Sequence, residues 1–196
     1  MRNTGADRIR PMKYRTLVSL LVLLCMAAVS TAVEVAGVTL PPTVTVEGKT
    51  LHLNGAGLRT KMMFKVYVAG LYLENTSKDA AAVVSSDQVK SMRLAIQRSL
   101  KGKQVSEAIE EGFEKNSKAQ MGALKARLDK LATLIPNVEK GDDIVLTYVP
   151  GKGTVVTVKG SEKGVVEGKD FGDALFAVWL GANPVQEDLK KELLKG

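Results

Sequence analysis

The sequence has few of the side chains that carry metal and thiol chemistry. It holds one cysteine, Cys25, and one histidine, His52. A structural zinc site normally takes four nitrogen or sulfur ligands, more than these two residues can supply. Aromatic residues make up only 5 % of the chain, so a nucleic-acid platform built on stacked rings has little to draw on. The composition therefore predicts neither a metal site nor a cofactor.

The N-terminal segment has the three parts of a secretory signal peptide. Arginines and a lysine come first, an apolar run follows over 17–29, and small residues occupy 30–32. We predict a signal peptide over 1–32, which leaves a domain over 33–196 in the periplasm or outside the cell. The alternative is an uncleaved anchor, although the run is short of the roughly 20 apolar residues of a membrane span. Leu24 before Cys25 argues against a lipoprotein signal, and Met12 is an alternative start.

Removal of this segment changes the charge of the protein. The whole chain carries a formal net charge of +7, and the segment contributes five basic side chains and one acidic one, or +4. The remaining domain is then +3, from +7 minus +4, and it contains no cysteine. Because a basic footprint is the first requirement for binding DNA or RNA, we expect no nucleic-acid partner. Membrane contact is expected only through the signal segment, before its cleavage.

Periodicity within the domain predicts an α+β fold. Alternating or β-branched segments indicate strands, and apolar stripes at helical spacing indicate helices. Short hairpins and clustered helices favour a large antiparallel sheet covered on one face by α-helices. The last helix is expected to be exposed. We predict strands over 43–46, 50–53, 62–74, 89–97, 143–149, 154–159 and 165–166, and helices over 78–86, 103–135 (with a joint near 116–120), 171–180 and 187–195.

Three polar or glycine-rich features have ordinary structural explanations. Residues 54–57 lack the Gly-Lys-Ser/Thr of a phosphate loop, so we expect a turn with positive φ there. His52 alternates with leucines and is expected to be an exposed strand residue. Asp142 and Asp143 are expected to be solvated turn acids.

Arg59 is the strongest candidate for a binding residue. It precedes the most apolar strand, and a guanidinium near an apolar sheet needs a partner. That partner is either an internal carboxylate or water, or else the carboxylate or phenolate of a ligand. Tyr67 could add a hydroxyl. Because eight residues of straight strand span about 26 Å, the two side chains share one ligand only if the chain turns near 60–62.

Two motifs around these residues resemble the chalcone isomerase-like family. They read Asn54-Gly-Ala-Gly-Leu-Arg59 and Lys65-Val-Tyr-Val-Ala-Gly-Leu-Tyr-Leu73, and the similarity continues to Asp173-Ala-Leu-Phe-Ala-Val-Trp-Leu-Gly181 and Asp188-Leu-Lys. The resemblance covers nearly all of 33–196 and implies a ligand cleft between the sheet and its helices. It also implies either ring closure of a chalcone, with an arginine holding the phenolate, or fatty-acid binding without chemistry.

The resemblance assigns roles to individual residues. Arg59 matches the arginine of both groups, whereas Tyr67 matches the tyrosine of fatty-acid binders rather than the catalytic threonine of isomerases. Val105 and Gly112 stand where isomerases have a tyrosine and an asparagine, and Val178 stands at their specificity position. We expect Arg59 and Tyr67 at the ligand head group, with Val105, Gly112 and Val178 lining the pocket.

Apolar replacements suit an acyl chain better than a polyphenol, because an acyl chain needs apolar wall and one polar anchor. We therefore expect an exported, non-catalytic binder of a fatty acid or similar apolar carboxylate. The alternative is an intramolecular lyase of the chalcone-flavanone isomerase type, acting on a chalcone or other enone, in which Arg59 would be catalytic. A third alternative is a structural or assembly partner. The sequence leaves the ligand's identity and the oligomeric state open.

Overall fold

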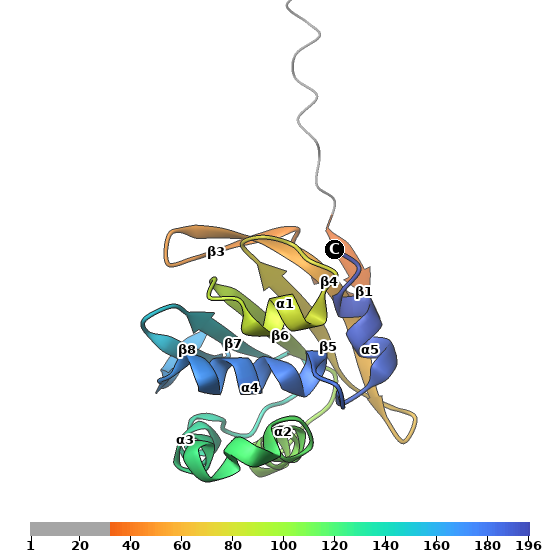
Figure 1. Ribbon diagram of the computed structural model, residues 1–196. Helices are drawn as coiled ribbons and strands as arrows, with labels where there is room; N and C mark the ends of the chain where they lie inside the picture. The colour runs from red at the N-terminus through yellow and green to blue at the C-terminus, as the bar shows by residue number, and fades with distance from the viewer. Residues whose placement is uncertain (1–31) are drawn as a thin grey trace, which may run out of the picture. The chain divides into compact units, whose positions relative to one another are not determined.

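The computed structural model describes residues 32–196, so the predicted signal peptide lies outside the described residues apart from Ala32. Seven antiparallel strands form one sheet in the order in which they occur in the chain (Figure 1). They are β3 (Thr43–Val46), β4 (Lys49–Lys61), β5 (Phe64–Leu73), β6 (Lys90–Ile96), β7 (Asp143–Val149), β8 (Gly153–Val158) and β9 (Ser161–Val166). A separate hairpin consists of β1 (Val33–Val35) and β2 (Val38–Leu40).

Helices connect and cover the strands. They are α1 (Ala80–Ser85), α2 (Gly102–Ser117), α3 (Met121–Leu134), α4 (Lys169–Leu180) and α5 (Glu187–Leu193), with a short 3₁₀ turn over Lys118–Gln120. None of the helices in this part of the chain is long and apolar enough to cross a membrane. The α+β class, the antiparallel sheet and the helical layer are confirmed, and the joint between the two long helices lies within the predicted interval.

The main core lies between the sheet and the helices. Ala69, Leu71 and Leu73 of β5 belong to it, together with Phe113 of α2 and Phe171 of α4. The intervening side chains of β5 point to the opposite face, where Val68 packs with Leu40 of the β1–β2 hairpin. Alternation along a strand sends successive side chains to opposite faces, so β5 is apolar on both because both are covered.

The glycine-rich segment 54–57 is the main correction to the predicted elements. It lies inside β4 rather than in a loop, with a register shift between Leu53 and Gly55, and neither of its glycines has a positive φ. A Cβ atom built on Gly57 would lie 2.8 Å from Glu192 Cβ and 2.9 Å from Leu189 Cδ1. The glycines are therefore needed because α5 crosses β4 closely, not because the backbone turns.

The prediction of an exposed last helix holds only for its polar face, where Glu187, Asp188 and Lys191 are exposed. Leu189 and Leu193 of α5 are buried in the main core. The prediction that Asp142 and Asp143 are solvated turn acids was wrong. Asp143 accepts hydrogen bonds of 2.9 and 3.2 Å from Arg93, and the Asp142 carboxylate lies 3.0 Å from the Lys159 ammonium. His52 is exposed, as expected.

Candidate functional site

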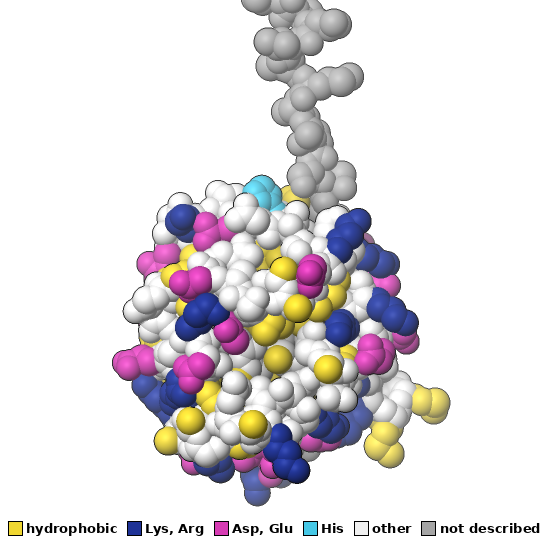
Figure 2. All heavy atoms as spheres, in the orientation of Figure 1, with side chains coloured by type: hydrophobic (Ala, Val, Ile, Leu, Met, Phe, Trp, Pro, Cys, Tyr) yellow, Lys and Arg dark blue, Asp and Glu magenta, His cyan; other side chains and the backbone are white. Residues whose placement is uncertain are grey.

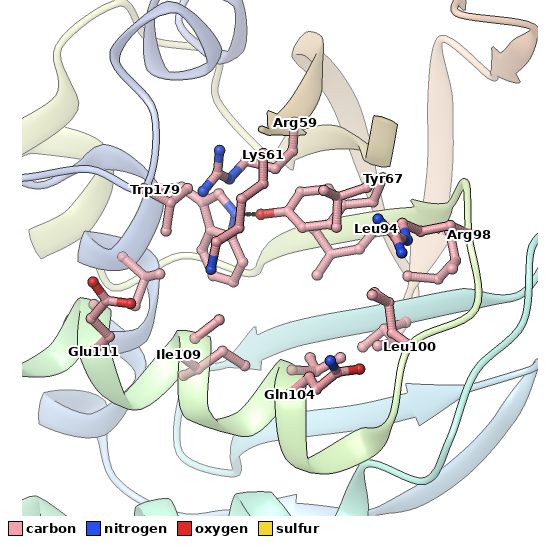
Figure 3. A pocket seen from close by; sticks show the side chains of 18 of the residues that line it. Arg59, Lys61, Tyr67, Leu94, Arg98, Leu100, Gln104, Ile109, Glu111 and Trp179 are labelled. Atoms are coloured by element: carbon pink, nitrogen blue, oxygen red, sulfur yellow. Dashed lines mark hydrogen bonds between the residues drawn. The ribbon is translucent and has the colours of Figure 1, made fainter. Parts of the chain in front are cut away.

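A cavity of about 430 Å³ opens between the sheet and the helices (Figure 3). Strands β4, β5 and β6 supply one wall, and helices α2 and α4 supply the facing wall. Aliphatic side chains line the cavity from both walls, which makes its interior a site for apolar groups. They include Val66, Leu94, Ile96, Val105, Ile109 and Val178.

Arg59 and Tyr67 lie directly opposite each other on neighbouring strands. The chain reverses at Met62 and Met63, and the β4–β5 register then pairs Arg59 with Tyr67. This reversal is the turn that the sequence required if the two side chains were to share one ligand. Both side chains reach the cavity, and Figure 3 shows them on the same side of it.

The Arg59 guanidinium is held by neutral oxygens. Its Nη1 donates to Gln186 Oε1 at 3.1 Å and to the Thr60 carbonyl, and the Thr60 amide donates to the same Gln186 oxygen at 3.0 Å. Within residues 32–196, no carboxylate forms an ion pair with Arg59, although its charge acts on Tyr67 and on Glu111. The guanidinium is thus positioned without a directly paired carboxylate, and N–H groups beyond those of Nη1 remain for an anion.

The hydroxyl of Tyr67 is oriented by the only tryptophan of the chain. Trp179 Nε1 donates to Tyr67 Oη at 3.0 Å, drawn as the dashed line in Figure 3. Burial raises the pKa of Tyr67, and the Trp179 bond and the Arg59 charge offset this only in part. The hydroxyl therefore keeps its proton at neutral pH. Since the oxygen already accepts a bond from Trp179, this proton is available to a further acceptor.

Further cations surround the opening of the cavity. Lys61 and Arg98 line it, and neither has a carboxylate partner in the described part of the chain. Glu111 and Lys115 also line it and pair with each other at 2.7 Å, which lowers the pKa of Glu111. The unpaired charges at the opening are therefore positive and favour an anionic ligand.

All five predicted site residues lie on the cavity wall, namely Arg59, Tyr67, Val105, Gly112 and Val178. That they bind a ligand stays a prediction. Gly112 also has a packing role, because a Cβ atom there would lie 2.7 Å from Val178 Cγ1.

Sequence reasoning missed Trp179, Gln186, Lys61 and Arg98. The single tryptophan inside an apolar helix was a usable signal, whereas nothing in the local sequence marks Gln186. Among residues 32–196 there is no cluster of side chains that could hold a metal ion.

Comparison with known proteins agrees with this architecture. The family model described as chalcone isomerase-like matches residues 32–195. This chain belongs to the chalcone isomerase-like family. The fold of the family is also that of a solved fatty-acid binding protein from Arabidopsis thaliana, with a TM-score of 0.68 at 17 % identity, over 84 % of this chain and 96 % of the plant protein. No curated protein gives a significant match.

Proposed function

We propose that this member of the chalcone isomerase-like family is an exported, non-catalytic protein that binds a fatty acid or a similar apolar carboxylate. The observation that carries the proposal is the pairing of Arg59 with Tyr67 at an apolar cavity, without an internal carboxylate on the guanidinium. The ligand carboxylate would lie between these two side chains, and its acyl chain would occupy the space between the sheet and α2.

The head-group contacts follow from the available donors. Arg59 offers charged N–H groups and Tyr67 offers one O–H group, which suits the two oxygens of a carboxylate. Gln186 and Trp179 hold the two side chains in place through their 3.1 and 3.0 Å hydrogen bonds. Because these intramolecular bonds already hold both side chains, little side-chain ordering is left to oppose binding.

The apolar wall would supply most of the binding free energy. Small-molecule sites usually enclose about 300–1,000 Å³, and the cavity of about 430 Å³ lies within this range. Each buried methylene contributes roughly 0.8 kcal/mol, so a chain of about ten carbons gains roughly 8 kcal/mol before the costs of association. Arg59 and Tyr67 would add affinity and fix the direction of the chain.

An enzymatic role as an intramolecular lyase is the second candidate, because Arg59 could hold a phenolate as well as a carboxylate. The wall argues against it. Val105, Gly112 and Val178 contribute no polar group at positions where the isomerases resembled by the sequence carry them. General acid–base catalysis usually contributes about 10²–10⁴-fold, and these three positions offer no group to provide it.

Trp179 provides the assay, because it is the only tryptophan and lies on the cavity wall. Saturated fatty acids titrated into the protein should change its emission in a saturable way. A chalcone, followed by its absorbance, should bind weakly and should not be converted. Turnover that is lost in Arg59→Ala would favour the lyase instead, and the absence of any response to fatty acids would contradict the binding proposal.

A further inference from the structure

The turn between β4 and β5 exposes three large apolar side chains in a row. Met62 is 84 % exposed, Met63 is 98 % exposed and Phe64 is 61 % exposed. We call residues 61–65 the tip. Figure 1 shows this hairpin extending away from the body of the domain, and Figure 2 shows apolar side chains projecting from the surface on that side. Such side chains favour burial against an apolar phase.

The requirements of the turn do not explain these residues. Met62 and Met63 have φ values of 48° and 66°, in the left-handed region that favours glycine. The other two-residue hairpin turns of the described chain have similar dihedrals, but each has glycine second, in Ala36-Gly37, Glu47-Gly48 and Lys159-Gly160. Among these turns, only the tip has a residue other than glycine at both positions, and both are methionines. Strain of this kind is typical of functional segments.

The surroundings of the tip are basic. Lys61 and Lys65 stand at its two ends, and both are exposed and lack an ion-pair partner in residues 32–196. The Arg98 guanidinium lies 4.9 Å from the centroid of the Phe64 ring. Apolar side chains surrounded by cations match an anionic lipid surface, where the cations meet phosphate groups and the apolar side chains enter the acyl boundary.

We propose that the tip docks on an anionic lipid bilayer, with Met62, Met63 and Phe64 inserted and Lys61, Lys65 and Arg98 at the phosphates. Lys61, Met62, Phe64 and Arg98 also line the cavity. A docked tip therefore brings the opening of the cavity to the membrane surface, where an apolar ligand can enter or leave without crossing water. This contact is additional to the one expected through the N-terminal segment. It needs no bound ligand, so its test is separate from that of the proposed function.

The test uses the full chain with Cys25→Ser, so that an environment-sensitive fluorophore can be attached to one introduced cysteine. Met62→Cys places the label on the tip. Lys152→Cys places it in the β7–β8 turn, which the strand register puts at the opposite end of the sheet. Vesicles contain phosphatidylcholine with about one-third phosphatidylglycerol, or phosphatidylcholine alone. Any binding by the N-terminal segment is common to both labelled proteins.

We expect the emission of the tip label to shift to the blue with the anionic vesicles and much less with the neutral ones. The label at position 152 should not respond. Lys61→Gln and Lys65→Gln should each weaken the vesicle affinity reported by the tip label about fivefold. Phe64→Ser should weaken it about tenfold.

Met63→Gly separates docking from folding. Glycine suits a φ of 66°, so the variant should unfold at a higher temperature than the parent while it binds vesicles more weakly. The proposal is overturned if the tip label remains in water in the presence of vesicles, or if both labels respond equally. It is also overturned if the tip label shifts without vesicles as the protein concentration rises, because the tip would then contact a second copy of the chain.

Discussion

Replacing the charge at the cavity opening gives the sharpest test of how the ligand is held. In Arg59→Met the aliphatic part of the side chain is largely kept and the guanidinium is lost. A hydrogen bond to a charged group contributes about 1.5–3 kcal/mol, so a fatty acid should bind roughly 10- to 150-fold more weakly. Tyr67→Phe removes one donor without changing the charge and should weaken binding about tenfold. Because the proposed function places both residues at the same carboxylate, the double variant should lose less than the sum of the two effects.

The methyl ester of the same fatty acid makes the matching change on the ligand. The parent protein should bind the ester about tenfold or more weakly than the acid, because the ester has no charge for Arg59 to pair with. Arg59→Met should bind acid and ester almost equally. The emission of Trp179 reports both titrations, since the residue lies on the cavity wall.

Arg127→Met is the matched control. Arg127 pairs with Asp170 at 2.6 Å and is not part of the cavity wall, so its loss should leave both affinities unchanged. If Arg59→Met bound the acid as tightly as the parent does, or if the parent failed to distinguish acid from ester, the assignment of Arg59 to the head group would be refuted.

Three further outcomes are expected. In a series of saturated fatty acids, affinity should rise about fourfold per added methylene and level off once the cavity is full, as measured by Trp179 emission; a flat series would exclude an apolar chain site. Gly57→Ala should lower the free energy of unfolding in urea by about 1–3 kcal/mol because its Cβ atom meets α5, whereas Gly122→Ala, in open space on α3, should raise it by about 1 kcal/mol. Burial raises the pKa of the Tyr148 hydroxyl, and the hydrogen bond to Asp87 and the charge of Asp87 raise it further. The contribution of this hydroxyl to the stability of the folded protein is therefore complete below about pH 10 and is lost as the pH rises further. The stability difference between the parent and Tyr148→Phe should therefore shrink above about pH 10 in alkaline unfolding experiments, and a constant difference would contradict this.

Much of the fold follows from local sequence patterns. Alternation along residues 64–73 predicts a strand buried on both faces, and the structure covers one face with helices and the other with the β1–β2 hairpin. The apolar stripes of 103–135 predict two helices with a joint, as observed. These features are visible in sequence because the side-chain period is a property of neighbouring residues in one element.

The partners of the site residues could not be read in the same way. Tyr67 is bonded by Trp179, and Arg59 by Gln186, each more than a hundred residues away along the chain. Resemblance to a family drew attention to Arg59 and Tyr67, but no local pattern indicates which distant side chain will hold them. The 54–57 segment was misread for the same reason, because its glycines fit a crossing helix that folds onto them from the other end of the sequence.

The sequence by itself therefore determined the order and type of most strands and helices, the apolar character of the layer between them, and the presence of a cation next to the central strand. Only the tertiary structure decided that this cation has no internal carboxylate partner in the described chain, that a cavity remains beside it, and that the β4–β5 turn presents its methionines to solvent. Secondary structure is set by side chains a few residues apart, whereas an open cavity, an unpaired charge and an exposed tip depend on what every other element leaves uncovered.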